Sequence, residues 1–327
     1  MGGSVVTPAR IQSTVPTTQP GRSCPISYRY SPSVFRRPPE LRSDAIYVVG
    51  GLYGNTLALD RIMEMARTEP AKVDVVFNGD FNWFNIDPAC FAKINVTVLH
   101  HIATRGNVET ELAHDDDTDG CGCGCAYPDW VADDVVNKSN QIMRSLRDTA
   151  MEHGVLRQRL AALPMHLVAQ VGGTKIAIVH GDAESLAGWS FAHEALSALT
   201  DDSNLRHYFE AADVPLFAST HTCLPVVKSV ELRDGPGAIV NNGAAGMPNL
   251  KRTTFGLVTR IATHPGPHAS AFNLRLRGLH IDLLKVDYDQ SRWLELFTRN
   301  WPADSPASLS YLDRIVAGPA FAGPIAV

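Results

Sequence analysis

The sequence has little of what marks several large classes of protein. Its 327 residues include only six cysteines, too few for a fold held together by disulfides at this length. No apolar run approaches the roughly 20 residues that a membrane-spanning helix needs. The first 20 residues also lack the apolar stretch of a secretory signal. We therefore expect a cytoplasmic protein that has no membrane partner.

An excess of positive charge is missing as well. The formal net charge is −5, so the composition gives no sign of a nucleic-acid-binding surface. With 45% hydrophobic and 19% charged residues, the chain is able to bury a large core. These values fit an enzyme-sized globular protein, and we expect no nucleic-acid partner.

Three zones follow one another along the chain. Residues 1–43 form an extension rich in Pro, Ser, Thr and Arg, which we expect either to dock on the body or to be a partly disordered tail. Residues 44–288 carry the strand and helix signals of the main domain. Residues 289–327 are expected to form a helical extension packed on that domain. Candidate anchors of the two extensions are Tyr28, Tyr30, Phe35, Trp293, Leu296, Phe297 and Trp301.

The hydrophobic pattern predicts strands that alternate with helices at first and then mostly strands. Predicted strands cover residues 46–49, 73–77, 96–99, 166–170, 175–179, 214–218, 226–232, 238–241, 255–261 and 279–286. Predicted helices cover about 57–66, 88–94 and 133–162, and Pro164 ends the last of them. This order indicates α/β layers with an antiparallel portion.

Short polar motifs follow several of these predicted strands. They occupy residues 50–55 (Gly-Gly-Leu-Tyr-Gly-Asn), 78–80 (Asn-Gly-Asp), 105–107 (Arg-Gly-Asn), 180–182 (His-Gly-Asp) and 220–223 (Thr-His-Thr-Cys). Asp, Asn and His are ligands of divalent cations, and ligands gather beyond the carboxyl ends of strands in open α/β sheets. Any one of these residues alone is more often an ordinary strand-end cap. Four of them in this order predict a metal site.

The order and spacing of the motifs resemble the calcineurin-like metallophosphoesterases over roughly residues 44–262. In that family the motifs read Asp-x-His-Gly-Asn, Gly-Asp-x-x-Asp, Gly-Asn-His-Glu/Asp, His-Gly and Gly-His-Thr-His. Residues 241–248 also resemble the later Asn-Pro-Gly-Ser-x-Gly turn of the family. The resemblance implies an α/β fold of two mixed β-sheets packed as a sandwich and flanked by helices.

The resemblance also implies that one of the two metal positions of the family is complete. Its ligands correspond to Asp80, Asn107, His180 and His221. At the other position, ligands of the family are replaced by Gly51, Tyr53 and Cys223, and Val108 stands where the family has its general-acid histidine. We therefore expect one divalent ion per chain (Zn, Mn or Fe), with Cys223 as a further candidate ligand.

Four other side chains are candidates for catalytic roles. Tyr53 is expected to hydrogen-bond a substrate oxyanion and Asn55 to line the pocket, whereas Glu109 and Asp182 are candidates for acid, base or additional ligand. The structural alternative for Tyr53 is a space-filling residue, and for Glu109 and Asp182 it is a solvated or capping residue. For Cys223 the alternative is a small buried hydrophobe. The general acid stays unassigned.

A second unusual segment, residues 115–125, reads Asp-Asp-Asp-Thr-Asp-Gly-Cys-Gly-Cys-Gly-Cys. Its thiols, Cys121, Cys123 and Cys125, are able to wrap a soft metal or to exchange disulfides. The spacing matches neither a Cys-x-x-Cys motif nor an EF-hand loop, so we favour a loop shaped by turn residues. The acidic run is expected to be a solvated face. Its position just after Asn107 makes this segment the best candidate for what replaces the lost metal position.

Together the motifs predict a metal-dependent hydrolase whose single ion activates water, most simply on a small-molecule phosphoester. Losing one proton donor typically costs about 10²–10⁴-fold in rate, so we do not expect efficient two-metal hydrolysis. One alternative is a non-catalytic metal- or ligand-binding relative of the same fold. Another is a repurposed hydrolase that acts on a non-phosphate substrate with the participation of cysteine.

Overall fold

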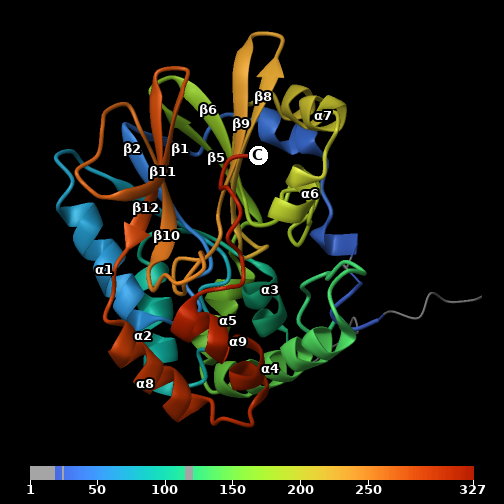
Figure 1. Ribbon diagram of the computed structural model, residues 1–327, viewed down its shortest axis with the longest axis vertical. Helices are drawn as coiled ribbons and strands as arrows, with labels where there is room; N and C mark the ends of the chain where they lie inside the picture. The colour runs from blue at the N-terminus through green and yellow to red at the C-terminus, as the bar shows by residue number, and fades with distance from the viewer. Residues whose placement is uncertain (1–18, 24–25, 115–120) are drawn as a thin grey trace, which may run out of the picture.

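Two sheets packed face to face form the centre of the molecule, and helices cover their outer faces (Figure 1). The computed structural model describes residues 19–23, 26–114 and 121–327, and over this part of the chain each sheet has six strands. The first 18 residues of the predicted extension and the acidic run at 115–120 lie outside the described residues. The predicted α/β sandwich of two mixed sheets is confirmed.

Each sheet combines parallel and antiparallel pairs. In spatial order, the first sheet contains β1 (Leu41–Ser43), β5 (His166–Val171), β6 (Thr174–Val179), β7 (Leu216–Ser219), β9 (Gly235–Asn242) and β8 (Pro225–Leu232). The second contains β11 (Ser270–Leu276), β12 (Leu279–Val286), β10 (Gly256–Ala262), β2 (Ala45–Val49), β3 (Asp74–Asn78) and β4 (Ile102–Thr104). Strands β2, β3 and β4 run parallel, as do β6, β7 and β9, so their carboxyl ends meet at one edge of each sheet.

The core between the sheets comes from alternating side chains, because successive residues of a strand point to opposite faces. In β2, Ile46 and Val48 belong to the core between the sheets, whereas Tyr47 and Val49 belong to the core under the helices. Strand β6 contributes Ile176 and Ile178 to the same inner core.

The outer face of the second sheet is covered by most of the helices. These are α1 (Thr56–Arg67), α2 (Pro88–Val98), α3 (Asn107–Ala113), α4 (Asp133–Met151), α5 (Gly154–Ala161), α8 (Gln290–Asn300) and α9 (Pro306–Ala317). The first sheet is covered by α6 (His193–Ser197), α7 (Ser203–Ala212) and the 3-10 turn η2 (Pro32–Arg36).

Some predicted elements are wrong in detail. Residues 96–99 are not a strand but the end of α2, which Asp87 caps at its start through a hydrogen bond from the Cys90 backbone N–H. Asn107 therefore follows β4. The predicted helix 133–162 is two helices, because the chain breaks at Glu152 and His153 before α5 begins at Gly154. Strands β1, β4 and β11 and helices α3, α6 and α7 were not predicted.

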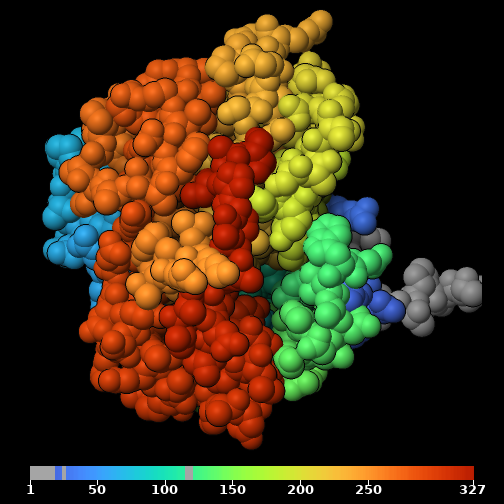
Figure 2. Space-filling view, viewed as in Figure 1, coloured from blue at the N-terminus to red at the C-terminus, as the bar shows by residue number. Residues whose placement is uncertain are grey.

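The described parts of the two predicted extensions contact the sheets. Phe35 is fully buried and its ring contacts that of Phe217, with centroids 6.0 Å apart. At the other end, the Val227 backbone N–H donates to the Ile325 carbonyl at 2.8 Å, and the red C-terminal segment lies across the face of the molecule in Figure 2. The domain boundaries at residues 43 and 288 stay predictions. Among the described residues, no helix has both the length and the apolar character needed to cross a membrane.

Candidate metal centre

Four polar side chains meet where the carboxyl ends of the parallel strands come together. Asp80 follows β3, Asn107 begins α3 after β4, His180 follows β6 and His221 follows β7, so both sheets contribute. All four residues are at least 94% buried. The ligand atoms of Asp80, His180 and His221 lie within 4.8 Å of one another. We call these four residues the retained half of the site.

The hydrogen bonds of the two imidazoles show which ring atoms face the centre. His180 Nδ1 lies 2.9 Å from the Asn78 carbonyl and His221 Nε2 lies 3.1 Å from the Cys125 carbonyl. A carbonyl only accepts, so each of these nitrogens donates. His180 Nε2 and His221 Nδ1 are then left without a proton in the neutral rings, and they face each other at 3.2 Å.

Two oxygens complete the cluster around His180 Nε2. Asp80 Oδ1 lies 3.3 Å from it and Asn107 Oδ1 lies 3.2 Å from it. Four acceptor atoms thus point at one buried volume, and a cation satisfies all of them at once. Zinc binds nitrogen and oxygen at about 2.0–2.2 Å in a tetrahedron, which spaces the ligand atoms roughly 3.3–3.5 Å apart. The residues present therefore fit a divalent ion.

Electrostatics favour one ion-pair arrangement within the cluster. Burial alone would raise the pKa of Asp80, but His180 outweighs it and lowers that pKa. Burial opposes a charge on His180 too, and Asp80 overcomes it and raises the pKa of the imidazole. Burial and the charge of His180 together lower the pKa of His221 to about 3. His221 is accordingly neutral, which is the form that binds a metal.

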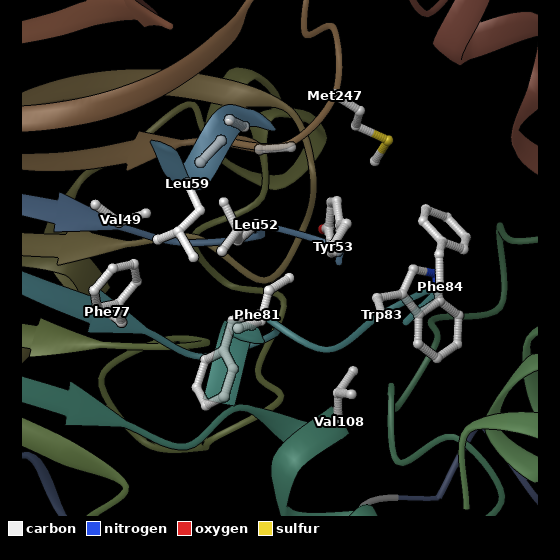
Figure 3. Packing of buried hydrophobic residues seen from close by; sticks show 14 of the residues in the cluster. Val49, Leu52, Tyr53, Leu59, Phe77, Phe81, Trp83, Phe84, Val108 and Met247 are labelled. Carbon is white, nitrogen blue, oxygen red and sulfur yellow. The ribbon is translucent and has the colours of Figure 1, made fainter. Parts of the chain in front are cut away.

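The other side of the site is built from different residues, Gly51, Tyr53, Val108 and Cys223, which we call the altered half. The Tyr53 hydroxyl lies 2.7 Å from Cys223 Sγ. A Cβ atom at Gly51 would lie 3.0 Å from Cζ of Tyr53, so the tyrosine ring fills the space into which a side chain at 51 would project. Val108 offers only its backbone N–H, which donates to Asp80 Oδ1 at 3.2 Å. Figure 3 shows Tyr53 and Val108 with the rings of Trp83 and Phe84 beside them.

Solved structures share this architecture. A metallophosphoesterase from Sphaerobacter thermophilus superposes with a TM-score of 0.53 and 17% identity, over 85% of this chain and 100% of that chain. The chain has the metallophosphoesterase fold. A hypothetical protein from Pyrococcus horikoshii OT3 superposes with a TM-score of 0.56 and 15% identity, over 84% of this chain and 98% of that chain. The sequence matches no protein-family model and no curated protein.

Within this metallophosphoesterase fold, the C-terminal helices cover the altered half. Arg314 of α9 donates to the carbonyl of Cys223 at 2.6 Å and to that of Pro248 at 3.1 Å. The Trp301 indole N–H donates to the Phe84 carbonyl at 3.0 Å. These bonds close the side of the site on which the ligands have been replaced.

A small cavity remains between the two halves, with a volume of about 30 Å³. That is room for an ion or one to two water molecules. Its polar lining comes from Asp80, Asn107, His221 and the thiols of Cys125 and Cys223; its aromatic lining comes from Tyr53, Trp83, Tyr127, Trp189 and Tyr311. Trp189 also lines an open hollow of about 460 Å³. The same indole therefore borders both the small cavity and the open hollow.

The backbone of the site is strained at four non-glycine residues. The φ angles of Tyr53, Asp80, His221 and Cys223 are 53°, 53°, 37° and 63°, all in the left-handed region that side chains disfavour. Such strain gathers at functional sites, where the surrounding structure maintains it.

The structure does not bring every predicted site residue to the cavity. Asn55 is the N-cap of α1, where it accepts from the backbone of Leu57 and Ala58, and its amide donates to the Gly246 carbonyl. Asp182 accepts from three backbone N–H groups, those of Glu184, Ser185 and Ser190. Their predicted catalytic roles stay predictions.

Glu109 lies directly behind the retained half. Its carboxylate accepts from the backbone N–H groups of Asp80, Phe81, Asn82 and Gly106 at 2.7–3.2 Å. Burial and the neighbouring Asp80 raise the pKa of Glu109 to about 7. Glu109 thus holds the turn that presents Asp80, and its predicted role as acid, base or ligand stays a prediction.

Sequence reasoning missed the aromatic wall of the cavity. Tyr127, Trp189 and Tyr311 come from three separate loops and helices, and Arg314 from the C-terminal extension. Trp189 lies seven residues beyond the His-Gly-Asp motif that ends at Asp182, which is a weak signal at most. Nothing in the local pattern of the other three points to the site, because only the tertiary fold brings them there.

Proposed function

We propose that the protein is a metal-dependent hydrolase that acts on a small phosphoester with one divalent ion. The observation that carries this proposal is the convergence of four acceptor atoms, two imidazole nitrogens and two side-chain oxygens, on one buried volume. When bound, a divalent ion polarises a phosphoester oxygen and lowers the pKa of its water, toward about 7 in the best zinc sites. Zn, Mn and Fe are the candidate ions for this donor set.

The residues of the chain divide the remaining work. Asp80, Asn107, His180 and His221 hold the ion, and Glu109 fixes the turn that presents Asp80. Tyr53 lines the cavity, and we propose that its hydroxyl hydrogen-bonds an oxyanion of the substrate. The general acid stays unassigned, since Val108 occupies the position that the family resemblance implies for it.

Substrate entry requires one wall of the cavity to move, because about 30 Å³ does not accommodate a phosphoester. Trp189 borders the open hollow, and its indole N–H donates to the Cys125 carbonyl at 2.9 Å. The C-terminal helices are fastened by three backbone-directed hydrogen bonds from Arg314 and Trp301. We infer that the substrate enters past Trp189.

The same small volume favours a second candidate function. A cavity with room for an ion but not for a phosphoester suits a metal-binding protein that has lost the reaction. The residues Gly51, Tyr53 and Cys223, which stand where the family resemblance implies ligands, also favour this candidate. The two candidates share the metal and differ in turnover.

Metal content and hydrolysis, measured together, test both candidates. Protein purified without chelators is analysed for bound metals and assayed with 4-nitrophenyl phosphate and bis(4-nitrophenyl) phosphate, as isolated and after Zn, Mn or Fe(II) loading. We expect about one ion per chain and hydrolysis that depends on it. His221→Ala should lose both, whereas the matched control His207→Ala, on the exposed face of α7, should keep both.

Each other outcome has a definite meaning. Two ions per chain would contradict the single-metal proposal. One ion without turnover of either ester would favour the non-catalytic candidate. No ion under any loading condition would contradict both.

A further inference from the structure

The cysteine-rich segment at residues 121–125 is the sequence motif that the proposed reaction does not use. Its alternation of cysteine and glycine has a backbone cause. Gly122 and Gly124 have φ angles of 62° and 66°, in the left-handed region. A Cβ atom would lie 2.2 Å from Asn140 Oδ1 at the first position and 2.6 Å from the Tyr28 hydroxyl at the second. The path of this loop therefore requires glycine at both positions.

The loop is fastened to the helices behind it. The Cys123 backbone N–H donates to Asn140 Oδ1 at 3.0 Å, and Arg147 donates to the Gly122 carbonyl at 3.2 Å. Cys121, Cys123 and Cys125 are all buried. The loop is thus a rigid part of the fold, and its carbonyl groups keep fixed directions.

Those carbonyl groups point at the side chains of the retained half. Asn107 Nδ2 donates to the Cys123 carbonyl at 2.9 Å and contacts Cys125 Sγ at 3.5 Å. His221 Nε2 donates to the Cys125 carbonyl at 3.1 Å. The loop therefore contacts two of the four proposed ligands, each through the atom that faces away from the centre.

Each contact selects one of two arrangements of its ligand. Because the loop accepts hydrogen bonds from the Asn107 amide nitrogen, Oδ1 of Asn107 faces the cluster. If the amide were flipped, its N–H groups would point at the cation instead. Holding His221 Nε2–H fixes the tautomer whose bare Nδ1 faces His180. Partners of this kind orient ligands and raise their affinity for the metal.

We propose that residues 121–125 form a positioning loop that sets the amide orientation of Asn107 and the tautomer of His221 for metal binding. This role rests on the proposed metal centre. It adds to that centre the residues that hold two of its ligands, Asn107 and His221, in the orientation that binds a metal. Cys125 acts here through Asn107 and not as a ligand. Among the described residues, the group of close ligand atoms contains Asp80, His180 and His221 without a cysteine.

Cobalt binding tests the loop without any assay of turnover. Co²⁺ affinity, by competition with a chelator, and the Co²⁺ absorption spectrum are measured for wild type, Cys125→Ala, Cys125→Ser and Gly124→Ala. The matched control is Cys90→Ala, a half-buried thiol on α2. Melting temperatures and circular dichroism confirm that each variant is folded.

We expect Cys125→Ala to weaken Co²⁺ binding about tenfold, and Gly124→Ala to weaken it by about 10–100-fold because it displaces the two carbonyls. Cys125→Ser should recover most of the affinity, since its hydroxyl still accepts from Asn107. Cys90→Ala should stay within about twofold of wild type. The wild-type spectrum should lack a thiolate-to-cobalt charge-transfer band.

Two results would overturn the positioning role of the loop alone. One is unchanged Co²⁺ affinity in both Cys125→Ala and Gly124→Ala. The other is a charge-transfer band that disappears in Cys125→Ser, which would make the thiol a direct ligand. A wild type that binds no Co²⁺ would overturn the metal centre itself, and the role of the loop with it. Failure of the loop is thus distinguishable from failure of the proposed function.

Discussion

The retained and altered halves of the cavity differ in chemistry although both belong to the same edge of the sandwich. In the retained half, acceptor atoms converge at 3.2–3.3 Å around His180 Nε2. In the altered half, the Tyr53 hydroxyl and the Cys223 thiol contact each other, and helix α9 covers them. The first half gathers ligand atoms that one cation satisfies together, whereas in the second half the hydroxyl and the thiol partner each other. One half of the cavity thus presents ligand atoms to a shared volume, whereas the other half is a packed wall.

Breaking the retained half should have the largest effect. Asp80→Asn removes the only carboxylate of the proposed ligand set, so we expect affinity for Zn²⁺ or Mn²⁺ to fall by more than about 100-fold, beyond what loss of an outer partner costs. Isothermal titration calorimetry measures this change, with Asp213→Asn, on an exposed turn after α7, as the control. Equal affinities in the two variants would remove the distinction between the halves.

Restoring the altered half is the reverse experiment. The triple variant Gly51→Asp, Tyr53→His, Cys223→His supplies the ligand types that the family resemblance implies, and the loss of the tyrosine ring makes room for a side chain at 51. We expect elemental analysis to rise from about one ion per chain to about two. The double variant that keeps Gly51 should stay near one. A triple variant with a single ion would show that the cover over this half, and not the ligands, decides occupancy.

Opening the cover should have a smaller effect. Tyr311→Ala removes a ring from the cavity wall, so we expect kcat/KM for 4-nitrophenyl phosphate to rise up to about tenfold, or 1.4 kcal/mol of barrier. Leu309→Ala, an exposed side chain on the same helix, is the control and should change nothing. A fall in kcat/KM would instead make Tyr311 part of the working site.

His166 lies outside the two halves of the site and should make the free energy of unfolding depend on pH. This contribution has to be measured before any pH dependence is assigned to the site itself. Burial and the charge of Arg37 lower the pKa of His166 to about 4, from an ordinary value near 6.5. The unfolded chain thus takes up a proton between pH 6.5 and 4 that the folded chain does not, so stability is lost as pH falls through this window. Because His166 is only half-buried, we expect about 1–2 kcal/mol, and His166→Gln should remove this part of the loss in urea titrations. An unchanged pH profile in His166→Gln would assign the loss elsewhere.

The smallest effect is expected for Tyr53→Phe. Removing the hydroxyl breaks its contact with Cys223 and should cost about 1 kcal/mol of folding free energy, measured by chemical denaturation. Metal affinity should stay within about twofold, since no atom of Tyr53 belongs to the retained half. A large fall in affinity would instead place the phenol in the metal's coordination shell.

The sequence predicted those parts of the fold and site whose signals are local. Asp80, His180 and His221 each follow a short apolar run, and strand-end geometry alone indicates that they meet. The prediction failed at residues 96–99 because an apolar run of four fits a helix end as well as a strand. It also left Glu109 and Asn55 with several possible roles, because the turn and the helix start that they hold are visible only in three dimensions. The sequence could not predict that Tyr311 and Arg314 cover the site, because they lie about 90 residues after Cys223 and reach it only through the tertiary fold.

Four residues of the site have a left-handed backbone that lowers the stability of the fold: Tyr53, Asp80, His221 and Cys223. A non-glycine residue in that region typically costs about 1–2 kcal/mol, which glycine would release. Where little packing is lost, a glycine substitution should therefore raise the melting temperature while it damages the centre. Melting temperatures of single glycine variants would then identify functional residues as those whose substitution stabilises the fold, before any substrate is known.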